Sequence, residues 1–339
     1  MPHIALAGLL PEEISARFQL AKPFMGRQIF KWIARGVSSF DAMTDLPLEL
    51  RGRLLEQAAL RTGNVLQTLE DPDGTIKLQI EFPDRIYIET VLLADEAERK
   101  TACVSSQAGC ALGCRFCRTG QLGFTRNLTA GEIVEQFLLL EKISGPLDNV
   151  VFMGMGEPLL NLEAVRKAVS ILTHPAGRNL SLRRITISTA GIIPGIYDLA
   201  DRGPAVRLAV SLTTADPALR NDLMPVARSN SLEELKKAIA YHGNKTGKRC
   251  TLEAALISGV NTGSESARQL AEFAGELGVH VNLIPWNPTA SLPFAEPAPA
   301  ECREFVRMLE ERKIPVTLRT RRGRKIGGAC GQLGQRKRG

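Results

Sequence analysis

The sequence is poor in aromatic residues and histidine and has no long apolar run, and each shortage excludes a class of protein or site. Its 339 residues include two Trp, three Tyr and four His, and aromatic residues make up 5% of the chain. No stretch reaches the roughly 18 apolar residues that a membrane-spanning helix needs. The first residues also lack the basic segment that begins a secretory signal. We therefore expect a cytoplasmic protein with no membrane partner, in which aromatic stacking contributes little to any nucleic-acid contact.

Acidic residues are absent from the last 28 positions, although the whole chain holds 36 of them against 43 Lys and Arg. Residues 312–339 carry ten basic side chains, so residues 1–311 keep 33 basic against 36 acidic groups. The net charge of +7 thus combines a nearly neutral body with a strongly basic end. Such an end predicts an anionic partner, nucleic acid first, although a solvated tail has the same composition.

The seven cysteines are an odd number, and three of them lie within eight residues of each other. This pattern is typical of a reducing compartment, where thiols bind metals or take part in catalysis rather than form a disulfide framework. Cys250 and Cys302 lie within apolar patterns, and we interpret them as packing thiols.

Hydrophobic periodicity predicts two parts, 1–85 and 86–330, followed by a basic C-terminal tail at 331–339. The first part is expected to be a small accessory domain with helices over 24–33 and 46–60 and a hairpin of strands 76–82 and 86–93. The second part alternates strands and helices in six units. Strands are expected at 101–106, 149–153, 184–188, 206–212, 251–257, 279–284 and 316–319. Helices are expected at 130–143, 162–172, 193–201, 232–242, 264–277 and 300–311.

Six strand–helix units imply an α/β fold, a parallel sheet with helices outside, either open or curled toward a barrel. Six units are too few for the closed eight-stranded barrel, which favours a partial (β/α)6 barrel. In both architectures the active site lies at the carboxyl ends of the strands.

A glycine-containing loop after the first of these strands contains Cys110, Cys114 and Cys117, in a Cys-x3-Cys-x2-Cys spacing. Thiolates this close on a flexible chain are what an iron–sulfur cluster needs. Three ligands leave one iron of a four-iron cluster open to a substrate or cofactor. A structural zinc site is the alternative, but it needs four ligands, and Cys103 is the only local fourth.

Polar residues follow several other strands of the predicted barrel. The second strand ends in Gly154-Met155-Gly156-Glu157-Pro158, where glycine lets a ligand approach the backbone and Glu157 can accept bonds from an ammonium group. Ser188, Ser211 and Asn287 also lie at strand ends. Each of these residues is also compatible with an ordinary turn.

Cys330 lies among small residues within the basic segment. The small neighbours are expected to leave its thiol accessible, and the nearby arginines are expected to lower its pKa. These are the properties of a nucleophile. Cys103 precedes the cysteine loop by seven residues, on the first strand.

The cysteine spacing resembles that of the radical S-adenosylmethionine (SAM) superfamily. Over almost the whole chain the sequence further resembles the dual-specificity RlmN family, radical SAM methyltransferases that act on adenine C2 in 23S rRNA and tRNA. The motifs that carry this resemblance are Phe24–Gln28, Cys103–Gln107, the cysteine loop, Gly123–Leu128, Gly154–Asn161, Asn282–Pro288 and Ala329–Leu333.

The resemblance implies a two-step mechanism. A first SAM methylates Cys330, and a second is cleaved at a 4Fe-4S cluster held by Cys110, Cys114 and Cys117. The methyl carbon then joins the adenine in a covalent adduct, which Cys103 resolves through a transient disulfide with Cys330. Glu89 corresponds to the proton acceptor of the family.

The resemblance also implies the remaining cofactor contacts and partners. The expected partners are 23S rRNA, tRNA and an electron donor such as flavodoxin, with the accessory domain binding RNA and the enzyme monomeric. The expected SAM contacts are Gly156, Glu157, Ser188, Ser211, Leu212, Thr213 and Asn287.

Two departures from the family pattern stand out. Thr213 takes the place of a usual histidine among the SAM contacts, and Arg324 and Lys325 stand where the family has acidic residues.

The related antibiotic-resistance methyltransferases, which modify adenine C8, usually have other residues in place of Pro158 and Trp286. Because this sequence has both Pro158 and Trp286, it favours methylation at C2. A radical SAM activase or maturase would explain the cluster but not Cys103 and Cys330, and a non-catalytic iron–sulfur RNA-binding protein would make both dispensable.

Overall fold

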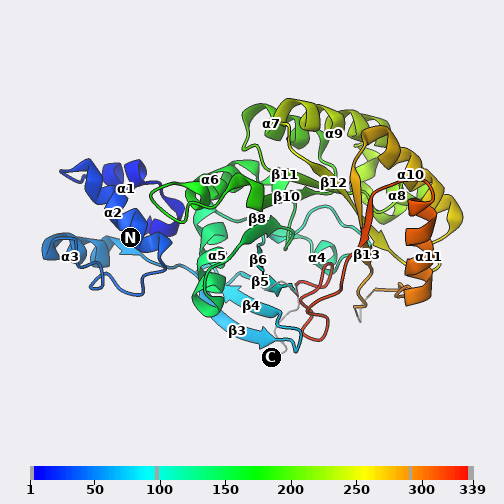
Figure 1. The fold of residues 1–339 in the computed structure, drawn as a ribbon. Helices are drawn as coiled ribbons and strands as arrows, with labels where there is room; N and C mark the ends of the chain where they lie inside the picture. The colour runs from blue at the N-terminus through cyan, green and yellow to red at the C-terminus, as the bar shows by residue number, and fades with distance from the viewer. Residues whose placement is uncertain (1–3, 96–98, 290–291, 335–339) are drawn as a thin grey trace.

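One ten-stranded sheet runs through most of the molecule, in the order β14-β13-β12-β11-β10-β9-β6-β5-β4-β3 (Figure 1). The computed structural model describes residues 4–95, 99–289 and 292–334. The seven strands from β6 to β14 in this sheet are mutually parallel, which confirms the predicted α/β fold and partial barrel. They are β6 (Lys100–Cys103), β9 (Asn149–Phe152), β10 (Ile185–Thr189), β11 (Arg207–Ser211), β12 (Cys250–Leu256), β13 (His280–Pro285) and β14 (Val316–Leu318).

The six predicted barrel helices cover the outer face of this sheet (Figure 1). The first begins at a capping box in which Thr129 and Glu132 satisfy each other's backbone N–H groups. Two short helices that periodicity did not predict, α4 (Arg118–Gln121) and α8 (Pro217–Leu223), lie at the carboxyl end of the barrel strands. The six predicted helices are α5 (Ala130–Ser144), α6 (Leu162–Thr173), α7 (Ile193–Arg202), α9 (Leu232–Thr246), α10 (Ser264–Leu277) and α11 (Pro299–Glu310).

Three antiparallel strands, β3 (Asn64–Glu70), β4 (Ile76–Glu81) and β5 (Tyr87–Ala94), extend the sheet beyond β6. The predicted hairpin is therefore present, and β5 pairs directly with the first barrel strand. The division predicted at residue 85 falls between β4 and β5, which are hydrogen-bonded neighbours. The sheet thus places residues 64–94 with the barrel.

The N-terminal lobe contains α1 (Pro11–Arg17), α2 (Pro23–Ala34) and α3 (Leu48–Gln57) at one end of the molecule (Figure 1). The last two confirm the predicted helices. The lobe meets the barrel through a backbone contact, because a Cβ on Gly8 would lie 3.0 Å from the amide nitrogen of Gly131 on α5. Buried apolar side chains form one continuous core through both parts. Among the described residues, no helix is both long and apolar enough to cross a bilayer.

Candidate active site

The cysteine loop follows β7 (Gln107–Gly109), a short strand that pairs with β8 (Phe124–Asn127). Gly109 has φ +75°, and a Cβ there would lie 1.9 Å from the carbonyl oxygen of Gly123, so only glycine fits this crossing. The loop packs on a small separate apolar cluster that includes Leu223 and Trp286. The indole Nε1 of Trp286 donates to the carbonyl of Phe116 at 2.9 Å, which fixes the loop between its last two cysteines.

The three loop cysteines are free thiols whose surroundings fit cluster ligands. Burial raises the pKa of Cys110 to about 11, and it also raises those of Cys114 and Cys117. N–H groups of Gly120 and Thr119 donate to the Cys117 sulfur and oppose this rise, as bonds around metal-ligating thiolates do. Iron binding would therefore displace the thiol protons.

Within the described residues, no three His, Cys, Asp or Glu side chains gather closely enough to hold a single metal ion. The cysteines of a four-iron cluster each bind a different iron, so they stand farther apart than the ligands of one ion. The described residues therefore do not form the closed four-ligand set of a zinc site. Support for the predicted cluster comes from the cysteine spacing and the donors around Cys117.

Arg220 on α8 is fully buried beside Cys114, and sequence reasoning missed it. Its guanidinium donates to the carbonyls of Ser211 (3.2 Å), Leu212 and Ala190 (2.8 Å), which joins the ends of β10 and β11. It forms no ion pair with any residue that the structure describes, and desolvation lowers its pKa to about 10. An arginine on a short helix resembles a surface residue in the sequence, so no signal identified it.

Gly156 and Glu157 lie where the chain leaves β9. The Glu157 carboxylate is buried, and its two oxygens accept the N–H groups of Leu159 (3.0 Å) and Ala190 (2.8 Å). Burial raises its pKa to about 7. The Thr189 hydroxyl also donates to this carboxylate. Three of its roughly four lone-pair sites are therefore used, and one remains for a further donor. Gly156 has φ +98°, and a Cβ there would lie 2.5 Å from the Cβ of Gln107, so here glycine permits close packing between the two loops.

The other predicted SAM contacts lie along the same edge. Ser188 and Ser211 are partly exposed, whereas Leu212 is fully buried. Thr213 has φ +63°, a rare conformation for a β-branched residue, and its N–H bonds to the carbonyl of Glu253 at 3.2 Å. Asn287 is buried with its Oδ1 unpartnered, and an unpaired acceptor of this kind is suited to a ligand.

The C-terminal segment returns to the cysteine loop and places Cys330 beside it. The N–H of Arg118, the residue after Cys117, donates to the carbonyl of Gly331 at 2.8 Å, and the Thr119 hydroxyl donates to that of Leu333 at 2.8 Å. Asn287 Nδ2 donates to the carbonyl of Cys330 at 3.1 Å. Sequence positions more than 200 residues apart thus form one site.

The predicted low pKa of Cys330 is wrong. Its side chain is exposed, yet the protein around it displaces water, and this desolvation raises the pKa of the thiol. The charges of Glu253 and Cys117 raise it further, and the charge of Arg319 lowers it. Two of the basic neighbours in sequence, Arg321 and Arg324, instead pair with Glu296.

The basic end of the chain is not a solvated tail over its described part. Asp73 Oδ2 accepts the N–H of Gly323 at 2.7 Å, and Asp71 Oδ2 accepts that of Lys325 at 3.0 Å. Both carboxylates come from the turn between β3 and β4. The last part of the predicted tail, residues 335–339, lies outside the described residues.

Glu89, the predicted proton acceptor, lies on β5 and forms a buried ion pair with Lys77 on β4 at 3.0 Å. The pair holds both sides of the Cys330 segment: Lys77 Nζ donates to the carbonyl of Gly327 at 3.2 Å, and Glu89 Oε2 accepts the N–H of Gly334 at 2.7 Å. Lys77 was not predicted, because a lysine in an alternating strand normally faces solvent.

We expect Lys77→Met to lower the free energy of unfolding by about 3–5 kcal/mol, because it leaves the buried Glu89 carboxylate without a countercharge. Urea denaturation of the purified protein measures this loss. The double variant Lys77→Met/Glu89→Gln should recover most of it, since a neutral amide still accepts the N–H of Gly334. Equal losses in both variants would show that the ion pair is not the cause.

Cys103 ends β6 and is buried, and desolvation followed by the charge of Cys330 raises its pKa. All seven cysteines are free, so the predicted disulfide between Cys103 and Cys330 is not found in this structure. Cys250 and Cys302 are buried in the core, as expected for packing thiols.

Glu253 on β12 is a third buried acid near the site, after Glu157 and Glu89, and sequence reasoning missed it. Its Oε1 accepts from Asn282 Nδ2 (2.8 Å) and the Thr251 hydroxyl (3.0 Å). Desolvation raises its pKa, and its charge acts on Cys330. Its strand looks apolar in sequence, and only the curl of the sheet brings it toward the C-terminal segment.

A partial barrel with three cysteines in the loop after its first parallel strand defines the class of this protein. The family model described as the radical SAM superfamily matches residues 104–274. A second model, described as the ribosomal RNA large subunit methyltransferase N-terminal domain, matches residues 6–60, which form the N-terminal lobe. The class is therefore that of radical SAM enzymes.

Full-length relatives narrow this class. The chain is 57% identical over 331 residues to the probable dual-specificity RNA methyltransferase RlmN of Treponema pallidum, covering 98% of this chain and 97% of that protein. It is 47% identical to the corresponding Moorella thermoacetica protein, with the same coverage. A radical SAM methyltransferase crystal structure from Sphaerobacter thermophilus has 41% identity and a TM-score of 0.93, covering 98% of this chain and 99% of that one. The chain belongs to the RlmN family and is a radical SAM RNA methyltransferase.

Proposed function

We propose that this enzyme methylates C2 of adenine in 23S rRNA and tRNA, in the cytoplasm and as a monomer, through a methyl group carried on Cys330. The observation that carries the proposal is the docking of the Cys330 segment on the cysteine loop, through the 2.8 Å bond from Arg118 to Gly331. A thiol needed only for packing would not be exposed beside three cluster-type cysteines.

The donor set supports the cofactors of this proposal. Cys110, Cys114 and Cys117 would hold a 4Fe-4S cluster, which supplies the electron for reductive cleavage of SAM after reduction by a donor such as flavodoxin. Glu157 would accept the SAM ammonium group with its remaining lone pair, and the unpartnered Oδ1 of Asn287 would accept a second donor. Gly156, Ser188 and Ser211–Thr213 shape the same edge of the site.

Two SAM molecules would be used in each turnover. The Cys330 sulfur loses its proton and takes the methyl group of the first, releasing S-adenosylhomocysteine. Its methyl group then gives a hydrogen atom to the radical derived from the second, and the remaining carbon bonds to C2 of adenine. Rearomatisation of the adduct would release the C2 proton and one electron. Glu89 is the proposed proton acceptor, with Gly334 linking it to the Cys330 segment, and the electron would return to the oxidised cluster held by the three loop cysteines.

Cys103 would complete the reaction. Its thiolate attacks the Cys330 sulfur, so that a sulfur–sulfur bond forms while the sulfur–carbon bond breaks. The carbon keeps the electron pair, takes a proton and remains on the base as a methyl group. External reduction of the disulfide then restores both thiols.

The chemistry of adenine accounts for this route. C2 is too poor a nucleophile to displace the methyl group of SAM directly, so a protein-bound carbon radical supplies the reactive partner. The base has to leave its stack to reach Cys330. Trp286 and Pro158, which favour C2 over C8, lie beside the cysteine loop and after β9, respectively.

Product analysis tests the proposal. The reconstituted holoenzyme with SAM and a reducing system should convert adenine to 2-methyladenine in a 23S rRNA fragment and in tRNA, as measured by mass spectrometry of nucleosides. RNA from cells that lack the protein should lose the same modification. A product methylated at C8 or on nitrogen would contradict the proposal.

A further inference from the structure

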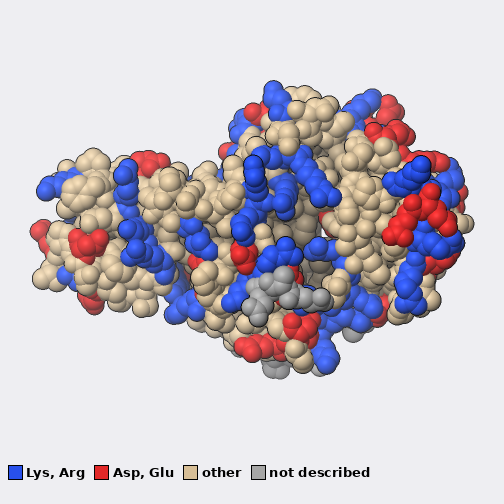
Figure 2. Space-filling model, viewed as in Figure 1, with Lys and Arg blue, Asp and Glu red and all other residues tan. Residues whose placement is uncertain are grey.

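Arg220 is a buried cation without an acidic partner, and no other described Lys or Arg combines these two properties. Lys77 and Arg220 are the only Lys or Arg side chains that are buried among the described residues, and Lys77 is paired with Glu89. The other described cations are half-buried or exposed, and Figure 2 shows Lys and Arg gathered over the N-terminal lobe and around the hollow of the barrel. A buried charge without a countercharge is costly, so the burial of this guanidinium calls for an anion nearby.

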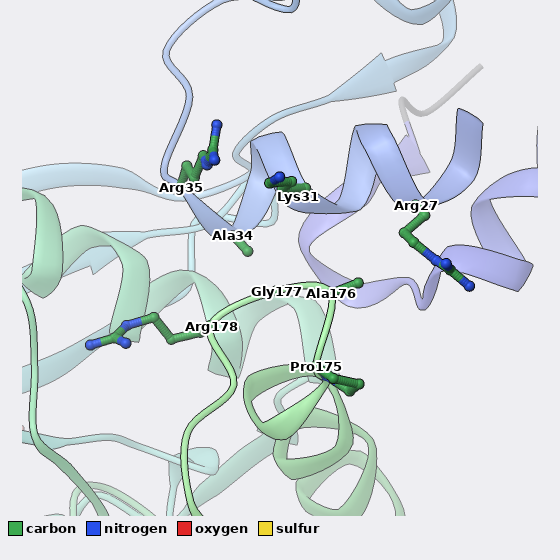
Figure 3. Close-up of a pocket in the computed structure, with 8 residues that line it drawn as sticks. All are labelled: Arg27, Lys31, Ala34, Arg35, Pro175, Ala176, Gly177 and Arg178. Atoms are coloured by element: carbon green, nitrogen blue, oxygen red, sulfur yellow. The ribbon is translucent and has the colours of Figure 1, made fainter. Parts of the chain in front are cut away.

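Exposed cations do not raise the same question, because water solvates them. Arg27, Lys31 and Arg35 on α2 line one wall of a hollow of about 390 Å³ between the lobe and the loop 175–178 (Figure 3). All three side chains are exposed. Solvent and salt therefore screen their charge, and its effect on a distant group in the barrel is small.

Backbone groups surround the Arg220 guanidinium. Nη1 donates to the carbonyls of Ser211 (3.2 Å) and Leu212, and Nη2 donates to that of Ala190 (2.8 Å). Gly191, with φ +106°, leaves room for the group, since a Cβ there would lie 3.2 Å from Nη2. These carbonyls accept N–H bonds but carry no net charge, and the buried Nε has no acceptor. The described protein therefore leaves the positive charge unbalanced.

Helix α8 carries this charge to the cysteine loop. The N–H of Arg115, the residue after Cys114, donates to the carbonyl of Leu223 at the end of α8 at 2.9 Å. Cys114 also packs against the apolar cluster that contains Leu223. Desolvation raises the pKa of Cys114 and lowers that of Arg220, and the attraction between thiolate and guanidinium opposes both shifts. Arg220 thus acts on one of the three cysteines expected to hold the cluster.

We propose that Arg220 is the countercharge of the 4Fe-4S cluster and raises its reduction potential. This inference rests on the proposed function, since it needs the three loop cysteines to hold that cluster. Three thiolates outweigh the charge of the oxidised iron–sulfur core, and reduction adds one more negative charge. A fixed cation therefore stabilises the reduced form more than the oxidised form, and in a buried site water screens this attraction little. The guanidinium would thus help a donor to supply the electron that cleaves SAM.

Arg220→Gln tests the proposal, because glutamine removes the charge while its amide still donates a hydrogen bond. The reconstituted holoenzyme, without RNA and without SAM, is titrated anaerobically with dithionite and redox mediators, and electron paramagnetic resonance measures the fraction of reduced cluster. We expect the equilibrium constant for one-electron reduction to fall roughly tenfold, which lowers the midpoint potential by about 59 mV. Arg220→Lys keeps the charge and should keep most of the natural potential. Iron and sulfide analysis checks that each variant holds a full cluster.

A second pair of variants neutralises the guanidinium without removing it. The Met224 sulfur lies 3.2 Å from Arg220 Nη1, so Met224→Glu would place a carboxylate beside the charge. Met224→Glu should lower the midpoint potential, whereas its neutral counterpart Met224→Gln should not. Arg220 keeps its backbone bonds in both variants, so this pair decides the question if Arg220→Gln does not fold. Equal potentials in the two Met224 variants would overturn the proposal.

Arg27→Gln is the matched control, since it removes an exposed cation from the N-terminal lobe, and it should leave the potential unchanged. An unchanged potential in Arg220→Gln would overturn the proposal. An equal fall in Arg220→Gln and Arg220→Lys would also overturn it, because Arg220 would then act only through its backbone bonds. Failure of the proposed function is distinguishable, because it would appear as a natural enzyme that holds no four-iron cluster or methylates no RNA, whatever the potentials of the variants.

Discussion

Cys330→Ala is expected to abolish RNA methylation completely while leaving the iron and sulfide content of the reconstituted enzyme unchanged. Alanine removes the sulfur that we propose carries the methyl group, but it leaves the three loop cysteines and the backbone bonds of the segment in place. The bonds from Arg118 and Asn287 involve only main-chain carbonyls of residues 330 and 331, so the segment should stay docked. Methylation assays with labelled SAM, together with iron analysis, measure both effects.

The matched control for this variant is Cys302→Ala, which removes a buried thiol from α11, outside the site. It should keep both the cluster and nearly full activity. Methylation by Cys330→Ala at the rate of the natural enzyme would contradict the proposed methyl-carrier mechanism. Loss of iron in Cys330→Ala would instead assign this cysteine to the metal site.

Cys103→Ala is expected to stop the reaction at the covalent adduct, so that protein and RNA become cross-linked. Alanine cannot attack the Cys330 sulfur, and the bond between that sulfur and the methylene carbon then has no means of breaking. A denaturing gel should show the protein shifted by the mass of the RNA, and nuclease digestion followed by mass spectrometry should locate the remnant on Cys330. Turnover should fall to background.

The double variant Cys103→Ala/Cys330→Ala separates this adduct from non-specific cross-linking, because it lacks the attachment atom and should give only free protein. Free protein alone in the single variant Cys103→Ala would count against the resolving role. Cys103 is buried with a raised pKa, and its direct neighbours in the sheet are Val91 and Val151. Its reaction therefore requires the Cys330 segment to move toward it and a local change that removes its proton.

The cluster loop and the barrel are visible in the sequence because their signals are local. The spacing of Cys110, Cys114 and Cys117 is a property of eight consecutive residues and does not depend on how the rest of the chain folds. Apolar periodicity is also local, because it follows from which face of each element is buried. All six barrel helices and all seven parallel strands are therefore confirmed close to their predicted positions. Short helices such as α4 and α8 are missed because they have too few turns to show a helical period in their apolar residues.

The residues that sequence reasoning missed share one property, which is that a charged side chain is buried by distant segments. Lys77, Arg220 and Glu253 each lie on an element whose pattern predicts an ordinary exposed or apolar position. Each is buried because another strand end, or the returning C-terminal segment, covers it. Propensity and spacing carry no information on such contacts, since the partners are up to 250 residues away.

The pKa of Cys330 shows how tertiary structure can reverse a local inference. Counting neighbours in sequence places several arginines around this thiol and predicts a low pKa. In the folded protein Arg321 and Arg324 turn to Glu296, which is far from them in sequence, and desolvation then dominates. The charge near a group in sequence is therefore a poor guide to the charge near it in space.

The sequence by itself determined the cysteine triad and the barrel, because these depend on residue type and local period. The family resemblance, rather than a local pattern, implied that Cys330 is the methyl carrier. The sequence also showed a basic end on a nearly neutral body, without deciding between a tail and a built segment. Only the tertiary structure showed that the described part of this basic end is a built segment. Asp71, Asp73 and the Lys77–Glu89 pair hold this segment against the sheet, because buried polar groups need partners wherever the chain can supply them.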